Sequence, residues 1–188
     1  MTITINQISS GMALNIDGNI YLITSYHHVK PGKGSAFARV KLKNLQNDAV
    51  IDRTFKTSDK LDDVPLEDRP LEYLYSTGSD YHFMDHSTFE EVVVSPETLG
   101  DTALFMPENL EVTGIFHNHR LLKIILPTFI SVPVSHADPG LRGDSSKAGT
   151  KPAKIETGAT VQVPLFVNTG DWIKIDTRSG EYVERVQK

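Results

Sequence analysis

The sequence predicts an all-β protein. Most of its apolar segments are short runs in which apolar and polar residues alternate, which is the period of a half-buried strand. Gly, Asn, Asp and Pro are frequent between these runs and favour turns. Only Ser95-Pro96-Glu97 carries a convincing helix start, with an N-cap serine, proline at the first helical position and an acidic first turn. We expect that helix to reach about Met106.

Length and composition limit the possible classes of protein. The chain has 188 residues, of which 39% are hydrophobic and 23% are charged, values typical of a globular protein. It has no cysteine, which excludes disulfides and thiolate metal sites and suits a reducing compartment. The apolar run 121–126 is far too short to span a bilayer, and the first residues show no signal-peptide pattern. We therefore expect a cytoplasmic protein with no membrane attachment.

Changes in composition divide the chain into three modules. The acidic, proline-bearing segment 62–68 is a plausible linker, and a second boundary falls near Pro127. The expected domains are 1–63, 64–127 and 128–188. Modules of this size are small for independent stability, so we expect them to pack against one another. In the last module, we expect 137–157 to form a long loop that precedes three strands.

The segment 36–45 gives the clearest strand pattern. One side of the expected strand carries small or aliphatic residues: Ala36, Ala38, Val40 and Leu42. The other side carries one aromatic and three basic residues: Phe37, Arg39, Lys41 and Lys43. Because side chains alternate across a strand, the first set predicts a core face and the second a basic surface. A similar β-rich pair, Ala13–Ile16 and 20–23, is joined by a glycine-containing hairpin turn at 17–19.

The net charge of −5 conceals a segregation of charge along the chain. Residues 1–61 hold eight Lys or Arg and four Asp or Glu, whereas 62–127 hold three basic and thirteen acidic residues. Residues 128–188 hold eight basic and seven acidic residues. A polyanion such as RNA would be attracted to the two ends and repelled by the middle.

The most unusual local feature is the tip Lys30-Pro31-Gly32-Lys33-Gly34 between two expected strands. Pro31 fixes φ, and the glycines on both sides of Lys33 permit left-handed geometry and remove neighbouring side chains. Lys33 would then project alone from a narrow tip, suited to phosphate contact or covalent extension. The alternative is an ordinary exposed turn lysine. A nucleotide-binding phosphate loop is disfavoured, because its Gly-Lys-Ser/Thr spacing and following helix are absent.

Two other function classes stay open at this point. A metalloenzyme could use His117 with His119, or the group His82, Asp85 and His86. No His-Glu-x-x-His helix is present, however, and solvated turn histidines explain the pattern better. A general single-stranded nucleic-acid binder needs aromatic and basic residues on one groove. Here Tyr73, Tyr75, Tyr81 and Phe83 fall in the acidic segment, which disfavours that class.

Motifs in all three modules resemble those of bacterial elongation factor P. In the first module, 28–34 (HVKPGKG) is followed by 36–39 (AFAR) and 41–45 (KLKNL). The middle module matches more loosely, through FMD at 83–85 and LGD at 99–101. The third module carries several further stretches similar to the family: 138–144 (DPGLRGD), 151–153 (KPA), 156–158 (ETG), 161–166 (VQVPLF) and 177–183 (TRSGEYV).

The resemblance implies an L-shaped molecule that mimics tRNA, with an SH3-like first barrel and two OB-fold barrels. It implies a non-enzymatic translation elongation factor that binds the ribosome between the P and E sites and contacts the P-site peptidyl-tRNA. Such a factor relieves stalling at consecutive prolines, while rRNA supplies the catalysis. We expect a monomer with no cofactor and no metal.

The resemblance also assigns roles to residues. Lys33 matches the loop lysine that points at the peptidyl-transferase centre and is lengthened by a lysine-modifying enzyme in many members. We expect nearby phosphates to be held by Lys30, Arg39, Lys41 and Lys43. Candidates for contacts with the small subunit or the anticodon end are Gly143, Asp144, Ser145, Arg178, Tyr182 and Arg185. A half-buried strand position for Tyr182 and simple solvation of the arginines are equally compatible with the sequence.

Overall fold

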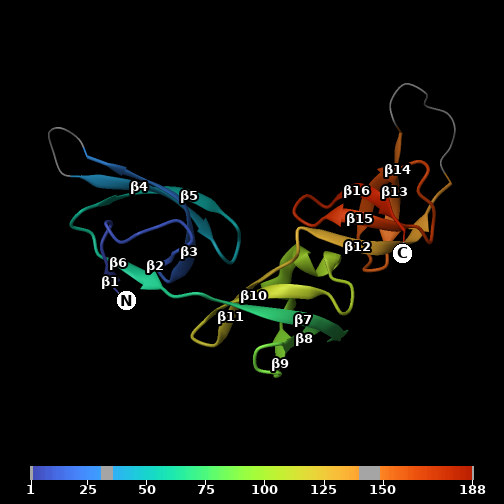
Figure 1. Ribbon diagram of the computed structural model, residues 1–188, viewed down its shortest axis with the longest axis horizontal. Coiled ribbons are helices and arrows are strands. Elements are labelled where there is room, and N and C mark those ends of the chain that lie inside the picture. The colour runs from blue at the N-terminus through green and yellow to red at the C-terminus, as the bar shows by residue number, and fades with distance from the viewer. Residues whose placement is uncertain (1, 31–35, 140–148, 188) are drawn as a thin grey trace. The chain divides into compact units, whose positions relative to one another are not determined.

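Strands dominate the computed structural model, which describes residues 2–30, 36–139 and 149–187 (Figure 1). The strands form three separate sheets that follow one another along the chain. Within the described segments there is one α-helix, of four residues. The predicted all-β class is therefore confirmed.

The first sheet has six strands in the spatial order β1-β6-β2-β3-β4-β5. Their bounds are β1 Thr2–Ile3, β2 Ala13–Ile16, β3 Asn19–Val29, β4 Phe37–Asn44, β5 Val50–Lys56 and β6 Leu61–Val64. The predicted alternation of β4 is confirmed, because Ala38, Val40 and Leu42 are buried in the core of this sheet whereas Arg39 and Lys41 are exposed. The expected hairpin turn at 17–19 joins β2 to β3.

Part of the segment expected to be a linker is strand instead. β6 pairs with β1 and with β2, and β7 begins at Glu67. Leu61 and Val64 are both buried, 5% and 6% exposed. The prediction was wrong here because β6 owes its structure to partners far away in the chain, and its acidic residues lie between the two buried positions.

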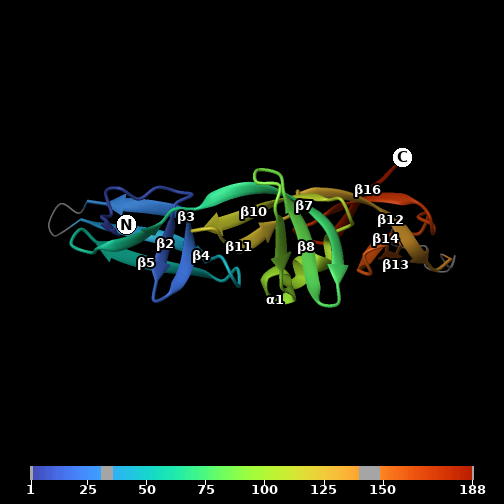
Figure 2. The same ribbon diagram turned by 90° about the horizontal axis from the view of Figure 1, so that it is seen from below.

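The second sheet has the order β11-β10-β7-β8-β9. Its strands are β7 Glu67–Thr77, β8 Asp80–Asp85, β9 Glu91–Val94, β10 Glu111–His117 and β11 Arg120–Ile125. β10 and β11 lie side by side (Figure 2) and are joined through Asn118 and His119. Both residues have positive φ, +48° and +63°, as in the two-residue turn that matches the strand twist. The predicted hairpin tip is confirmed.

The α-helix begins where it was predicted but ends earlier than the expected position near Met106. α1 covers Pro96–Leu99, and Ser95 is its N-cap although the serine side chain makes no capping hydrogen bond. Gly100 has a φ of +54°, which ends the α-helical ladder, and the chain continues as the 3₁₀ helix η1 over Gly100–Phe105.

The third sheet has the order β14-β13-β12-β15-β16. Its strands are β12 Phe129–Ala137, β13 Thr150–Ile155, β14 Thr160–Pro164, β15 Trp172–Asp176 and β16 Glu181–Val186. The expectation of a loop throughout 137–157 was wrong, because β13 lies inside it. Lys151, Ala153 and Ile155 are buried alternately along β13, and the Lys151 ammonium donates a hydrogen bond to the carbonyl of Asp138 at 2.7 Å.

Contacts among the described residues divide the chain into two compact units. One contains Met1–Asp68 with Ile115–Lys123, and the other contains Arg69–Gly114 with Ile124–Lys188. The second unit therefore holds most of the middle sheet together with the whole third sheet. The domain boundaries expected at residues 63 and 127 stay predictions.

Candidate functional site

The candidate site is the outward face of the β3–β4–β5 sheet in the first unit. Directly paired residues on adjacent strands point to the same side of a sheet. Arg39 of β4 therefore lies between His27 of β3 and Thr54 of β5. Lys41 lies between Ser25 and Asp52 in the next row. These rows form an outer surface opposite the apolar core.

Arg39 and Lys41 are both exposed and project from the middle of this surface. The Arg39 guanidinium carbon lies 5.8 Å from the ring centroid of Phe37, which is two residues away on the same side of β4. A guanidinium held over an aromatic ring keeps its charge and its hydrogen-bond donors. Arg39 can therefore still bind a phosphate.

Lys43 differs from its neighbours because it has a partner within the chain. Its ammonium lies 2.8 Å from a carboxylate oxygen of Asp48, and Lys123 of β11 lies 2.5 Å from the same oxygen. Partial burial disfavours the charged form of Asp48, but hydrogen bonds from Lys123 and Lys43 outweigh it and hold the pKa of Asp48 below its usual value. Asp48 thus takes up part of the charge that Lys43 could offer to RNA.

β3 and β4 also lead to the predicted tip. Lys30 follows β3 directly and is exposed. The predicted tip residues Pro31, Gly32, Lys33 and Gly34 lie outside the described residues. The strands that flank them pair up to Val29 and Phe37.

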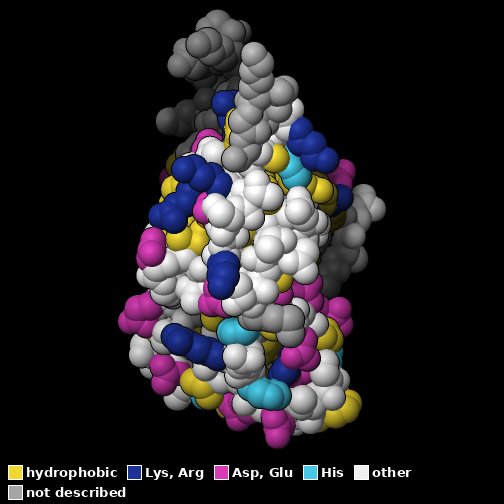
Figure 3. Space-filling view, turned by 90° about the vertical axis from the view of Figure 1, so that its left-hand side faces the viewer, with side chains coloured by type: hydrophobic (Ala, Val, Ile, Leu, Met, Phe, Trp, Pro, Cys, Tyr) yellow, Lys and Arg dark blue, Asp and Glu magenta, His cyan; other side chains and the backbone are white. Residues whose placement is uncertain are grey.

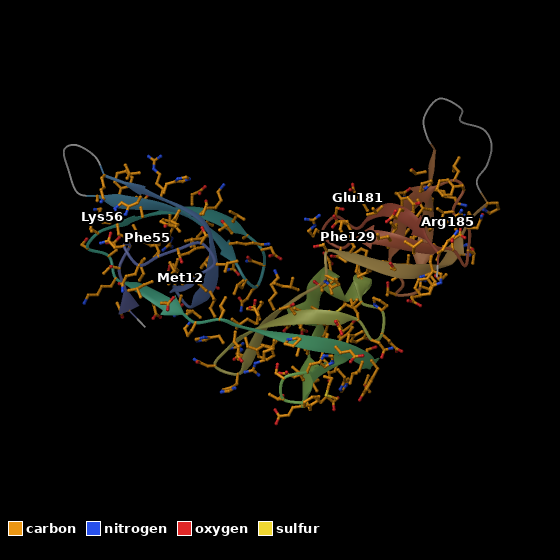
Figure 4. All side chains as sticks on the ribbon, viewed as in Figure 1. Met12, Phe55, Lys56, Phe129, Glu181 and Arg185 are labelled. Atoms are coloured by element: carbon orange, nitrogen blue, oxygen red, sulfur yellow. The ribbon has the colours of Figure 1, made fainter. Side chains whose placement is uncertain are left out.

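The sequence analysis missed one basic residue of this surface. Lys56 of β5 pairs with Phe37, so its exposed side chain joins the outer face next to the row of Arg39. Figure 4 labels Lys56 and its neighbour Phe55, which is buried on the opposite face. Strand alternation counted outward from Phe55 would have placed Lys56 on the basic side.

Figure 3 draws the side of the molecule on which the first unit lies nearest the viewer. Lys and Arg side chains gather on the upper part of this face. The outer face of β4 supplies a basic surface of this kind in the first unit, which matches the excess of Lys and Arg in residues 1–61. A polyanion would approach it favourably.

The predicted contact residues of the third domain are described only in part. Gly143, Asp144 and Ser145 lie outside the described residues. Arg178 lies in the turn between β15 and β16 and is bound to Asp176, with Nη2 2.6 Å from Oδ2 and Nε 3.0 Å from Oδ1. These hydrogen bonds, with one from the Arg178 backbone, lower the pKa of Asp176 from 3.8 to about 2.

Tyr182 and Arg185 of β16 have different surroundings. Tyr182 is half-buried and packs against the apolar core of the third sheet. Arg185 has its guanidinium carbon 5.7 Å from the ring centroid of Phe166, and its Nη1 lies 3.6 Å from a carboxylate oxygen of Asp171. Their assignment to small-subunit contacts stays a prediction, and the structure supplies each with a partner inside the third domain.

Three of the four histidines considered for a metal site have protein partners, and the fourth, His119, is an exposed turn residue as expected. His82 bonds the Glu91 carboxylate, and His86 lies 3.0 Å from the Glu72 carboxylate. His117 bonds the carbonyl of Pro65 at 2.8 Å, so it is not simply a solvated turn residue as expected. No group of three or more His, Asp or Glu side chains suited to a metal ion occurs within the described part of the chain.

Family models match the chain in three consecutive segments. The Elongation factor P (EF-P) KOW-like domain matches residues 4–61, and the Elongation factor P (EF-P) OB domain matches 66–124. The Elongation factor P, C-terminal model matches 127–185. Relatives match over nearly the whole length as well. Elongation factor P of Natranaerobius thermophilus is 44% identical over 98% of this chain and 98% of its own, and that of Rhodococcus opacus is 46% identical over 96% and 97%.

The chain belongs to the elongation factor P family. It is a translation elongation factor built from a KOW-like domain of the SH3-like type and OB-type barrels, as predicted. The chain is also similar to the solved structure of eukaryotic translation initiation factor 5A from Methanococcus jannaschii. The match covers 66% of this chain and 94% of that structure, with a TM-score of 0.50 and 25% sequence identity. None of the helices in residues 2–30, 36–139 and 149–187 has the length and apolar character needed to cross a membrane.

Proposed function

We propose that this member of the elongation factor P family binds the ribosome between the P and E sites and contacts the P-site peptidyl-tRNA through the Lys33 loop. One observation carries the proposal: the strands β3 and β4 that flank residues 31–35 bear an exposed basic surface. Lys30, Arg39 and Lys41 hold phosphates of tRNA or rRNA near that loop. Lys43 contributes less, because Asp48 neutralises part of its charge.

The factor acts by positioning. Proline is a poor nucleophile and its fixed φ restricts the nascent chain, so peptide transfer between prolines is slow. A contact that holds the acceptor end of the peptidyl-tRNA in a reactive geometry lowers the activation free energy without chemistry by the protein. The rRNA supplies the catalysis, and the factor, a cytoplasmic monomer, relieves stalling at consecutive prolines. A lysine-modifying enzyme extends Lys33.

The third domain makes a second contact in this proposal. The segment Gly143, Asp144 and Ser145 meets the small subunit or the anticodon end of the tRNA. Arg178 and Arg185, exposed at the turn before β16 and along it, approach phosphates, while Tyr182 holds β16 against the core. Two basic contact regions agree with the excess of basic residues at the two ends of the chain.

The loop lysine is tested by Lys33→Ala in a reconstituted translation system. We expect formation of consecutive Pro–Pro bonds to slow by roughly tenfold or more, which is a loss of about 1.4 kcal/mol of positioning, with no change for a reporter without proline runs. Lys60→Ala is the matched control, since it removes one exposed lysine of the same domain. Equal rates for the Lys33→Ala and Lys60→Ala proteins on the polyproline reporter would contradict the proposal.

The modification has its own measurement. Intact mass of the protein from its native host, localised by fragmentation, should show a mass increment on Lys33 and none on Lys30. An unmodified Lys33 in a protein that still relieves stalling would remove the modifying enzyme from the proposal and leave the positioning role intact.

A further inference from the structure

The second unit contains a cavity that shares no lining residue with the basic surface of the first unit. Its volume is about 620 Å³, within the range of sites for small ligands. The middle domain and the third domain both contribute to its lining, which includes three aromatic residues and two carboxylates: Tyr73, Tyr81, Trp172, Glu108 and Glu156. Within that lining there is no Lys, Arg or His.

The aromatic walls come from regular strands. Tyr73 of β7 and Tyr81 of β8 have ring centroids 6.0 Å apart and planes inclined by 42°. Trp172 opens β15 and pairs with Pro133 of β12, which places its indole on the third-domain side of the cavity. Tyr81 and Trp172 are only partly buried and line the cavity.

Hydrogen bonds within the protein hold the segments that line the cavity in place. The backbone N–H of Tyr73 donates to the carbonyl of Leu110, and that of Asn109 donates to the carbonyl of Tyr73, which holds segment 107–110 along β7. Across the cavity, the Thr157 hydroxyl donates to the carbonyl of Leu104 at 2.6 Å. A cavity with fixed walls loses little entropy when it binds a ligand.

The two carboxylates are available to a ligand. Glu108 and Glu156 are exposed, and no side-chain hydrogen bond or ion pair joins either of them to another residue of the described chain. Each approaches the cavity from a different domain. Aromatic faces attract cations through their quadrupole, and the two carboxylates of the lining add charge complementarity. An anion or phosphate would be repelled.

From these features we infer that the cavity binds a guanidinium group, presented as an arginine side chain by another protein. A planar guanidinium stacks on aromatic rings and offers donors in a fork that suits carboxylates, whereas an ammonium is a compact, strongly hydrated point charge. This site goes beyond the proposed function, because it involves neither the Lys33 loop nor the basic surface of β4.

The chain provides its own probe for the test. Trp172 is the only tryptophan of the sequence and lines the cavity, so its fluorescence reports on occupancy. The full-length protein is titrated with N-acetyl-arginine amide, with the neutral citrulline analogue of the same shape, and with spermidine. We expect a saturable change with the arginine probe, none with citrulline, and weaker binding of spermidine.

Paired variants identify the carboxylates. Glu108→Gln and Glu156→Gln should each weaken binding of the arginine probe by roughly two- to fivefold, the range for exposed ion pairs. Glu90→Gln in the middle domain and Glu181→Gln in the third remove a carboxylate outside the cavity and should leave binding unchanged. The inference is overturned if no saturable change occurs with arginine, if citrulline or spermidine binds as tightly, or if all four variants behave alike.

Discussion

Some basic side chains that the sequence predicts to bind RNA are already paired with acidic residues of the same chain. Arg178 forms a two-pronged pair with Asp176, and Lys43 shares Asp48 with Lys123. An intramolecular carboxylate competes with phosphate for the same cation, so exposure alone overstates what a basic residue can offer. Composition and spacing predicted that Arg178 and Lys43 are basic and accessible, but not that each has an acidic partner.

The Asp176–Arg178 pair gives a prediction that depends on pH. NMR titration should find a pKa of about 2 for Asp176, and Arg178→Ala should move it upward toward 3.8 because the side-chain hydrogen bonds are the largest cause of the shift. The folded-state pKa is lowered, so the stability contributed by the pair is fully present above the ordinary pKa and is lost as pH falls through about 2.

A control variant isolates the cause of that shift. Arg185→Ala removes a neighbouring cation that pairs with Asp171 instead, and it should leave the titration of Asp176 where it is in the parent protein. A titration of Asp176 that is the same with and without Arg178 would disprove the assignment.

Individual strands were predictable where alternation is strong and both neighbouring strands are close in the chain. β4 is the clearest case: its inward residues are fully buried and its outward residues form the candidate site. β6 and β13 were not predicted as strands. β6 is short and acidic, and β13 contains Pro152 and two lysines. Lys151 of β13 is buried, an orientation that composition disfavours.

Adjacent residues of β4 provide a matched pair for stability. Leu42→Ala removes a fully buried side chain from the first core and should lower the free energy of unfolding by about 2–5 kcal/mol. Lys41→Ala, on the exposed side, should change it by no more than about 0.5 kcal/mol. Denaturant titration of the full-length protein measures both changes. Similar losses for the two variants would contradict the strand orientation on which the basic surface depends.

Taken as a whole molecule, the chain couples its middle and third domains through a small apolar contact inside the second unit. Phe105 at the end of η1 packs against the core of the third sheet. A Cβ atom on Gly180 would lie 3.2 Å from the Phe105 ring, so the turn before β16 closes tightly over it. Thr157 adds a hydrogen bond to the carbonyl of Leu104. These contacts make joint unfolding of the two domains the expected behaviour.

Truncation of this contact should uncouple the two domains. Phe105→Ala removes about 1–2 kcal/mol of apolar burial and should split or broaden the calorimetric unfolding transition that the middle and third domains share. Leu104→Ala is the control, because the Leu104 side chain is 46% exposed and its carbonyl is kept. One unchanged transition in both variants would show that Phe105 does not couple the domains.

By itself, the sequence determined the strand-rich class, the two faces of β4, the hairpin turns at 17–19 and 117–120 and the basic character of the first sixty residues. These depend on alternation, turn chemistry and composition, all of which are local. Only the tertiary structure decided that 61–64 and 150–155 are strands and that Asp48 holds Lys123, 75 residues away. It also assembled the cavity around Trp172 from two domains. Such features require partners that are distant in the chain, and local sequence patterns do not predict contacts between distant residues.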